Sequence, residues 1–163
     1  MPEKVISTCR VDVAGRKRYH SRNHPETIKE KPTMQLTKED ALRAYARMMN
    51  TLYVSHLEPL LADDFHYASQ MVFEEITSRD DFIAYITPKL QAIADAGATA
   101  YAEMAWDDHR GPAAPEPCVV MAQGDKDNLV ATVLAEVGDG KIRRLDMCII
   151  PPPTQMRRTG EYP

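Results

Sequence analysis

Apolar residues recur at helical spacing in two segments of the chain. The first segment follows Thr37, which forms a capping-box pattern with Asp40, and its apolar positions continue to residue 52. The second follows Ser78, which has an aspartate at the same offset, and Gly97 is placed to end it. Two helices are therefore predicted, each with an apolar face that another layer must cover.

The remaining pattern predicts a further short helix and a series of strands. The short helix falls at residues 56–61, and turn sequences rich in Gly, Asp and Asn separate the strand candidates. The strands are predicted at residues 65–70, 72–76, 99–107, 117–123, 129–137 and 141–150. Helices grouped ahead of a long meander favour an α+β fold, in which the N-terminal helices pack on a strongly curved antiparallel sheet.

The two ends of the chain differ from its middle. Residues 1–33 show no sustained periodicity, and basic residues outnumber acidic ones there, so we expect an arm that is mobile or strapped on the surface. Residues 34–151 are predicted to form a single domain, which suits a chain of 163 residues. Residues 152–163 follow as a C-terminal tail to which the pattern assigns no element.

Charge and cysteine content narrow the classes of partner and compartment. A net charge of −4 offers no domain-wide basic surface, so no nucleic-acid partner is expected. No apolar run approaches the roughly 18 residues that cross a bilayer, so no membrane partner is expected either. Three cysteines, far apart in the sequence, argue against a disulfide framework and for a cytoplasmic protein. His20 and His24 lack a further ligand, and neither a metal nor another cofactor is expected.

Several of the predicted strands are apolar on both faces. In the last strand, one face carries Leu145 and Met147, while the other carries Cys148 and Ile150. A sheet with helices on one side alone should show a polar outer face. A second copy of the chain is the expected cover, which predicts a homodimer through the outer face of the sheet.

Three stretches carry a resemblance to a known superfamily. LLADDF follows the first helices, SRDDFIAYI opens the next helix, and VGDGKIRRLD forms the last hairpin. In this order and spacing they resemble the nuclear transport factor 2-like superfamily, which includes SnoaL-like proteins and ketosteroid isomerase. The resemblance spans residues 36–151. It implies a cone-shaped α+β fold with a pocket between helices and sheet, and pairing of two copies through the outer face.

The resemblance to ketosteroid isomerase implies three functional positions in this sequence. Tyr45 matches the phenol that donates a hydrogen bond to the developing oxyanion. The position of the carboxylate base falls at Ser69, which cannot accept a proton near neutral pH. The position of the oxyanion acid falls near Val133, where no carboxyl group lies. The resemblance therefore implies a pocket without the complete catalytic set of the isomerase.

The strand that contains Ser69 divides its residues between a pocket face and an outer face. Phe65, Tyr67 and Ser69 alternate on the pocket face, and His66 turns outward unless a bulge reverses it. The candidate catalytic residues are Tyr45 and Tyr67 as hydrogen-bond donors and His66 as a base. The predicted pocket lining is Tyr45, Met48, Met49, Phe65, Tyr67, Ser69, Trp106, Val133, Leu145 and Met147.

Three functions remain open at this point. One is a pocket that binds a small, largely apolar or aromatic molecule, with phenols as donors and methionines that adapt to its shape. Another is an enzyme of the cyclase, dehydratase or isomerase kind that uses His66 as its base. The last is a dimeric scaffold whose cone is filled by side chains. The direction of His66 separates the enzyme from the binding protein.

Overall fold

The computed structural model describes residues 35–71, 74–109 and 114–163 of the chain. The chain divides into two compact units, Met1–Thr33 and Met34–Pro163. Every described residue belongs to the second unit, so the predicted N-terminal arm lies outside the described residues.

The described part of the second unit consists of helices and strands in the predicted order. Its elements are α1 (Lys38–Thr51), η1 (Val54–His56), η2 (Glu58–Leu60), β1 (Leu61–Ser69), α2 (Arg79–Asp95), β2 (Ala100–Asp107), β3 (Glu116–Gln123), β4 (Leu129–Gly138), β5 (Lys141–Cys148), η3 (Pro153–Gln155) and β6 (Arg157–Arg158), where η marks a 3₁₀ turn. The α+β class expected from the sequence is confirmed.

Both α-helices begin at the residues that the sequence marks as caps. The Thr37 hydroxyl accepts a hydrogen bond from the Asp40 amide at 3.1 Å, and the Asp40 carboxylate accepts one from the Thr37 amide at 3.1 Å. Ser78 accepts from the amide of Asp81 at 3.2 Å in the same way. These bonds satisfy amides that a helix leaves without a partner in its first turn. The two predicted helix starts are confirmed.

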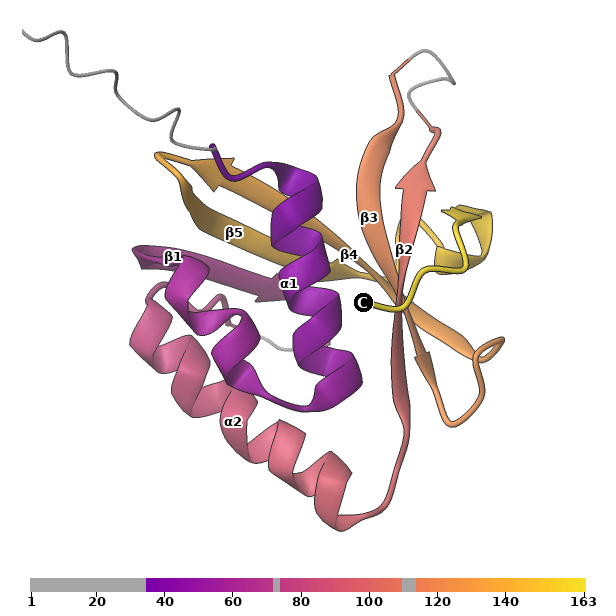
Figure 1. The fold of residues 1–163 in the computed structure, drawn as a ribbon, viewed down its shortest axis with the longest axis horizontal. Helices are drawn as coiled ribbons and strands as arrows, with labels where there is room; N and C mark the ends of the chain where they lie inside the picture. The colour runs from indigo at the N-terminus through magenta and orange to yellow at the C-terminus, as the bar shows by residue number, and fades with distance from the viewer. Residues whose placement is uncertain (1–34, 72–73, 110–113) are drawn as a thin grey trace, which may run out of the picture. The chain divides into compact units, whose positions relative to one another are not determined.

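One curved, six-stranded sheet in the described residues carries both helices. Its strand order is β1-β5-β4-β3-β2-β6, with antiparallel neighbours except for β1, which pairs parallel to β5. In Figure 1, β2 and β3 run at a steep angle to β1 and β5, and α1 lies on the concave side. The predicted antiparallel sheet is therefore correct for the meander from β2 to β5 and wrong for the edge strand β1.

Two shorter predictions need correction. The helix expected at residues 56–61 is present in part, as the short 3₁₀ helices η1 and η2, and β1 begins at Leu61. The strand expected at residues 72–76 is reduced in the described residues to a single bridge between Tyr67 and Ile76. Residues 72 and 73 lie outside the described residues.

The main core lies between the two helices and the concave face of the sheet. Helix α1 packs on β2, β3 and β4, and α2 packs on β1. Phe82 of α2 is fully buried, with ring centroids 5.0 Å from Phe65 and 5.1 Å from Tyr67. These two strand residues project from the same face of β1, as the alternation in the sequence predicts.

The C-terminal segment, residues 156–163, runs along the free edge of β2. Strand β6 pairs with β2 at residues 105 and 106, and beyond it the Met104 amide donates to the Glu161 carbonyl at 2.9 Å. The Asn50 side chain donates to the backbone carbonyl of Pro163 at 3.0 Å, so the segment also contacts α1. The tail that the sequence left without an element is therefore part of the sheet.

A buried carboxylate anchors this C-terminal segment. Glu103 of β2 has a side chain that is 3% exposed. Its oxygens accept hydrogen bonds from Arg158 at 2.8 Å, from the Tyr162 hydroxyl at 2.7 Å and from the Gly160 amide at 2.7 Å. Burial pushes the pKa of Glu103 upward, but these bonds outweigh burial and hold the pKa below its usual value.

The same segment covers part of the outer face of the sheet. Met156 is buried in a second, smaller core with Ala105, Cys118 and Val120. Part of the apolar outer surface that we assigned to a second copy is thus covered by the chain itself. Exposed apolar residues remain near the ends of β4 and β5, where Val130 is 38% and Ile150 is 74% exposed.

Candidate functional site

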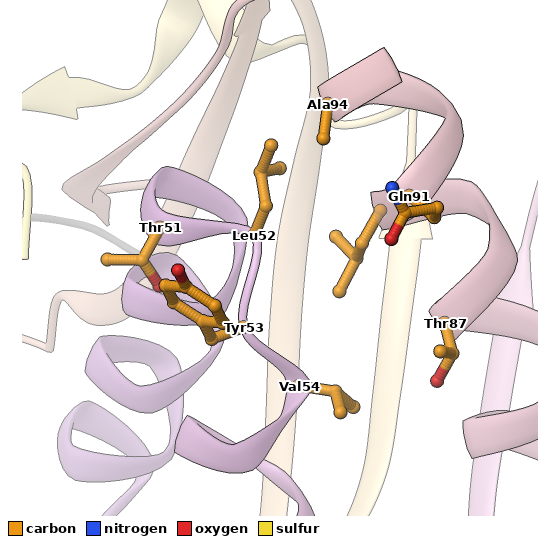
Figure 2. Close-up of a pocket in the computed structure, with 8 residues that line it drawn as sticks. Thr51, Leu52, Tyr53, Val54, Thr87, Gln91 and Ala94 are labelled. Atoms are coloured by element: carbon orange, nitrogen blue, oxygen red, sulfur yellow. The ribbon is translucent and has the colours of Figure 1, made fainter.

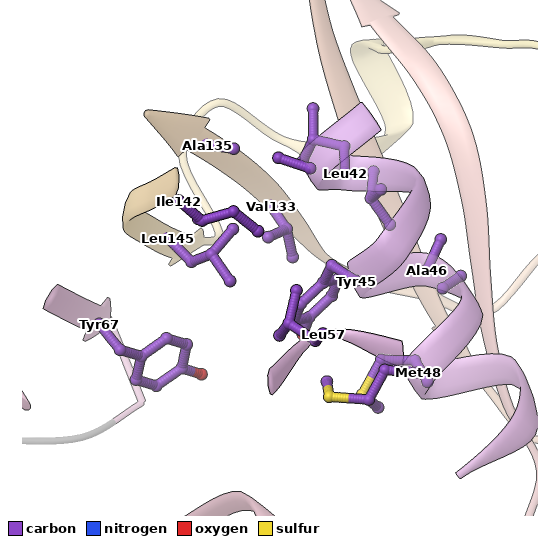
Figure 3. Packing of buried hydrophobic residues seen from close by; sticks show 14 of the residues in the cluster. Leu42, Tyr45, Ala46, Met48, Leu57, Tyr67, Val133, Ala135, Ile142 and Leu145 are labelled. Carbon is purple, nitrogen blue, oxygen red and sulfur yellow. The ribbon is translucent and has the colours of Figure 1, made fainter. Parts of the chain in front are cut away.

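Two buried phenols from different elements lie inside the main core. Tyr45 of α1 is 1% exposed and Tyr67 of β1 is 3% exposed. In Figure 3 the Tyr67 ring points from β1 toward the side of the core where Tyr45 and Leu57 lie. Their positions follow from the helical spacing of α1 and the alternation of β1. The structure thus brings these two predicted donors into one core.

The hydroxyl groups of the two phenols differ in their hydrogen bonds. The Tyr45 hydroxyl forms no hydrogen bond within the described residues. No fully enclosed side-chain nitrogen or oxygen in that part of the chain lacks a partner, so the Tyr45 oxygen is not fully enclosed. The Tyr67 hydroxyl donates to the sulfur of Met147 at 3.8 Å, and sulfur is a weak acceptor. Ser69 and Tyr85 are the other polar neighbours of this hydroxyl. Buried phenols normally have a hydrogen-bond partner, which Tyr45 lacks.

Both phenols are held in their neutral, donating form. Burial raises the pKa of Tyr45 well above its usual value, and the nearby phenols of Tyr67 and Tyr85 raise it further. Burial is also the main cause of the raised pKa of Tyr67, with a further increase from Tyr85 and an opposing hydrogen bond from Ser69. Both groups therefore act as hydrogen-bond donors, and neither acts as a base, near neutral pH.

Tyr85 and Lys89 of α2 extend this group of phenols toward solvent. The ring centroids of Tyr85 and Tyr67 are 5.7 Å apart. The Lys89 ammonium donates to the Tyr85 hydroxyl and lies 4.0 Å from the centre of the Tyr85 ring. Sequence reasoning missed both residues. The sequence did hold a signal for them. Tyr85 and Lys89 follow Phe82 by three and seven positions, and this spacing places all three on adjoining parts of one helix surface.

Ser69 lies at the end of β1 on the same face as the phenol of Tyr67. It is 9% exposed, and its hydroxyl accepts a hydrogen bond from the Met71 amide at 3.1 Å. The Ser69 oxygen therefore stabilises the turn that follows β1, and it also interacts with the Tyr67 hydroxyl. The side chain at position 69 therefore contributes a hydroxyl beside Tyr67 and no base.

The other predicted lining residues divide into core and rim. The main core contains Met48, Met49, Phe65, Val133 and Leu145, and half-buried Met147 packs against it. Trp106, which is half-buried near the end of β2, is not part of that core. We name the group formed by Tyr45, Tyr67, Ser69, Tyr85 and Met147 the phenol site.

His66 lies on the opposite face of β1 from the phenol site. Its Nδ1 is 2.8 Å from a Glu75 carboxylate oxygen, and its side chain is 43% exposed. Arg144 also contacts Glu75 and forms an ion pair with Asp146 at 2.9 Å. The structure therefore places His66 in a charged group on the outer face. It does not bring the three catalytic candidates together.

A groove of about 320 Å³ lies beside α2, on a different flank of this helix from Tyr85 and Lys89 (Figure 2). It lies between the end of α1 with the turn after it and the C-terminal half of α2. Its lining is Thr51, Leu52, Tyr53, Val54, Thr87, Leu90, Gln91 and Ala94. None of the ten predicted pocket residues lines this groove. Leu90 and Leu52 belong to or pack against the main core, so the floor of the groove is the core itself.

Two kinds of feature are not found in the described part of the chain. Residues 35–71, 74–109 and 114–163 contain no group of three or more His, Cys, Asp or Glu side chains that could hold a metal ion. No helix within those residues is long and apolar enough to cross a membrane.

Comparison with solved structures shows which fold the domain has. A SnoaL-like protein of unknown function from Burkholderia thailandensis is 15% identical and has a TM-score of 0.51, with 70% of this chain and 97% of that chain covered. An NTF2-like protein of unknown function from Cytophaga hutchinsonii is 12% identical, with a TM-score of 0.49 and coverage of 73% and 96%. A putative ketosteroid isomerase from Kribbella flavida is 25% identical, with a TM-score of 0.45 and coverage of 77% and 82%.

The domain therefore has the nuclear transport factor 2-like fold that the sequence predicts. No protein-family model matches the sequence. No curated protein matches it either. Because one fold of this kind carries many functions, the function has to be argued from the phenol site.

Proposed function

We propose that the protein binds a small, largely apolar or aromatic molecule, with the phenols of Tyr45 and Tyr67 as hydrogen-bond donors. The observation that carries this proposal is the Tyr45 hydroxyl, which forms no hydrogen bond in the described residues although Tyr45 as a whole is 1% exposed and belongs to the main core. A buried polar group without a partner costs free energy, and a ligand oxygen that accepts its hydrogen bond would recover that cost.

The surroundings of the phenols support binding over proton transfer. The phenol site contains no carboxylate and no imidazole. His66, the base of the enzyme alternative, lies on the outer face of β1 and pairs with Glu75. Methionines beside the phenols adapt to ligands of different shape, because the thioether chain is flexible and polarisable. The site thus offers donors and an apolar surround without a base.

Replacing Tyr45 by phenylalanine is expected to weaken binding and to stabilise the free protein. The affinity for 2-acetylnaphthalene, an aromatic ketone, should fall about five- to tenfold because one neutral hydrogen bond is lost. The free energy of unfolding without ligand should rise by about 1 kcal/mol, since a hydroxyl without a partner is removed from the core. Calorimetric titration and urea denaturation measure the two changes.

Tyr53→Phe is the matched control for this variant. Tyr53 is 67% exposed, so loss of its hydroxyl should change neither quantity. Equal affinities of the wild type and Tyr45→Phe, or no binding by either, would remove the proposal. If Tyr45→Phe instead lowers the free energy of unfolding as much as a cavity in the core would, the hydroxyl has a structural role.

We also propose a homodimer through the part of the outer face that the C-terminal segment leaves open. Its support is the exposed apolar surface near the start of β4 and the end of β5, where Val130 is 38% and Ile150 is 74% exposed. Isolated apolar residues are common on protein surfaces. Exposed apolar residues that lie together, next to a sheet face that is itself partly apolar, favour an interface.

The substitution Ile150→Lys is expected to raise the dissociation constant of this dimer about tenfold or more. An ammonium placed in an apolar interface must lose its hydration without gaining a partner. The change Asp125→Lys, in the β3–β4 turn, is the control and should leave the dimer intact. Sedimentation velocity over a wide concentration range provides the measurement. A wild-type chain that stays monomeric throughout would contradict the proposal.

A further inference from the structure

We infer that the edge of β2 is a docking site for an extended segment, and that the C-terminal segment of a second copy of the chain can occupy it. In the structure, the C-terminal segment of the same chain lies along this edge. The edge lies across the sheet from β1, which carries Tyr67 and Ser69 of the phenol site. The docking site is therefore separate from the proposed function.

The backbone of β2 offers a template for another strand. The Met104 amide donates to the Glu161 carbonyl at 2.9 Å, and the Met104 carbonyl accepts from the Thr159 amide at 3.1 Å. Residues 105 and 106 pair with β6. Without the segment, these groups would form an open sheet edge, and open edges pair readily with extended segments of other chains.

Charged side chains beside this edge make the docking site selective. The Glu103 carboxylate is 3% exposed and accepts a hydrogen bond from Arg158 at 2.8 Å, so a segment without a guanidinium there would leave a buried charge unpaired. Farther along, Arg43 donates to the two Glu161 carboxylate oxygens at 3.0 and 3.1 Å. A matching segment therefore needs an arginine and, three positions later, an acidic residue. The C-terminal segment of every copy has both.

The C-terminal segment is held as a bound peptide would be, with little packing in a core. Met156 is buried, whereas residues 157–161 are exposed. The anchors of the segment on β2 and α1 lie 55 and 118 positions earlier in the chain, so they do not require that the segment belong to the same chain. Residues 149–152, which precede the segment, form neither helix nor strand. The same contacts can therefore form when a second copy donates the segment.

The segment of the same chain competes with that of a second copy. Its short connection to β5 keeps it near its own docking site at an effective concentration of about millimolar. A free segment at micromolar concentration cannot displace it unless the bound one is weakened. We therefore expect a chain with a weakened segment to accept one from outside.

A synthetic peptide of residues 156–163 tests the docking site in the full chain. In Arg158→Met, Glu103 lacks its guanidinium partner, and the peptide supplies one. Fluorescence anisotropy of the labelled peptide should show that Arg158→Met binds it about tenfold or more tightly than the wild type, whose own segment competes. A peptide that itself carries Arg158→Met should lose this binding. A peptide with Arg157→Met should keep it within about twofold, because Arg157 pairs with Asp108 on the surface.

Glu161→Arg supplies a second host, in which Glu103 keeps its partner. This substitution places two guanidinium groups together at Arg43 and weakens the segment at the protein surface alone. It too should bind the wild-type peptide more tightly than the wild-type chain does. If neither host gains affinity over the wild type, or if the peptide with Arg158→Met binds equally well, the edge of β2 is not a docking site.

A mixture of two full-length variants tests whether a second copy donates the segment. Glu103→Gln has an intact segment and an altered docking site, whereas Arg158→Met has an intact docking site and a weakened segment. In sedimentation velocity, an equimolar mixture should form a complex that exceeds the association of either variant alone. A mixture of Glu103→Gln with Arg157→Met should show no such excess. Peptide binding without a complex in the first mixture would overturn the second copy as the partner.

Discussion

Replacing Arg158 by methionine is expected to lower the free energy of unfolding by about 2–3 kcal/mol near neutral pH. The substitution leaves the buried carboxylate of Glu103 without its charged partner, while the hydrogen bonds from Tyr162 and the Gly160 amide remain. Removing one partner of a fully buried ion pair lowers the free energy of unfolding by more than this. Here the loss is smaller because Arg158 is 31% exposed and water screens part of its interaction with Glu103.

The effect of Arg158→Met should depend on pH in a defined direction. In the wild type, the hydrogen bonds outweigh burial and hold the pKa of Glu103 below its usual value. The pair therefore contributes stability above the unfolded pKa, about 4.3, and this contribution is lost as the pH falls through the lower folded pKa. In the variant, burial is less opposed and the folded pKa is higher. The difference between the two proteins should widen from pH 3 to pH 7 in urea denaturation.

Two further variants test the cause. Arg157→Met changes the neighbouring arginine, which pairs with Asp108 on the surface, and should leave stability nearly unchanged. Adding Glu103→Gln to Arg158→Met should recover part of the loss, because no buried charge then lacks its partner. If Arg157→Met and Arg158→Met are equally destabilised, loss of a positive charge explains the result and the anchor at Glu103 does not.

Replacing Ser69 by aspartate is expected to destabilise the fold by about 2–4 kcal/mol at pH 8, relative to Ser69→Asn. Ser69 is 9% exposed beside Tyr67, so a carboxylate there would lose most of its hydration. Its folded pKa should rise above the unfolded value of about 3.9, at a cost of about 1.4 kcal/mol for each unit. The Met71 amide, which already donates to Ser69, limits the cost.

The sign of the pH dependence follows from the raised pKa. Because the unfolded aspartate loses its proton at lower pH than the folded one, stability falls as the pH rises between the two pKa values and then levels off. Asparagine has nearly the same shape and no charge, so Ser69→Asn should show no such fall. Parallel curves for the two variants from pH 4 to pH 8 would mean that position 69 is not an apolar site.

Local signals in the sequence predicted the parts of the fold that depend on local interactions. The helix starts at Thr37 and Ser78 were correct because a cap and its partner lie three residues apart. The inward face of β1 was correct because alternation along a strand fixes which side chains share a face. The burial of Tyr45 and Tyr67 follows from the same two periodicities.

Contacts between distant residues explain what the sequence did not reveal. Glu103 and Arg158 are 55 positions apart, and no periodic pattern marks the C-terminal segment as a strand. Without that segment, the apolar outer face appeared to need a second copy, whereas Met156 covers part of it. Tyr85 and Lys89 were overlooked because residues at the edge of an apolar helix face resemble ordinary surface residues until the position of β1 is known.

The contacts of the C-terminal segment also constrain how the domain folds as it is synthesised. Arg43 of α1 pairs with Glu161, 118 positions later, and Asn50 bonds the backbone of Pro163, 113 positions later. Glu161 and Pro163 leave the ribosome after the rest of the described domain, so the edge of β2 and one side of α1 stay uncovered until the C-terminal segment has emerged. The hairpins from β2 to β5 join neighbours in sequence and can form earlier. A nascent chain stalled before residue 157 should therefore retain an open sheet edge.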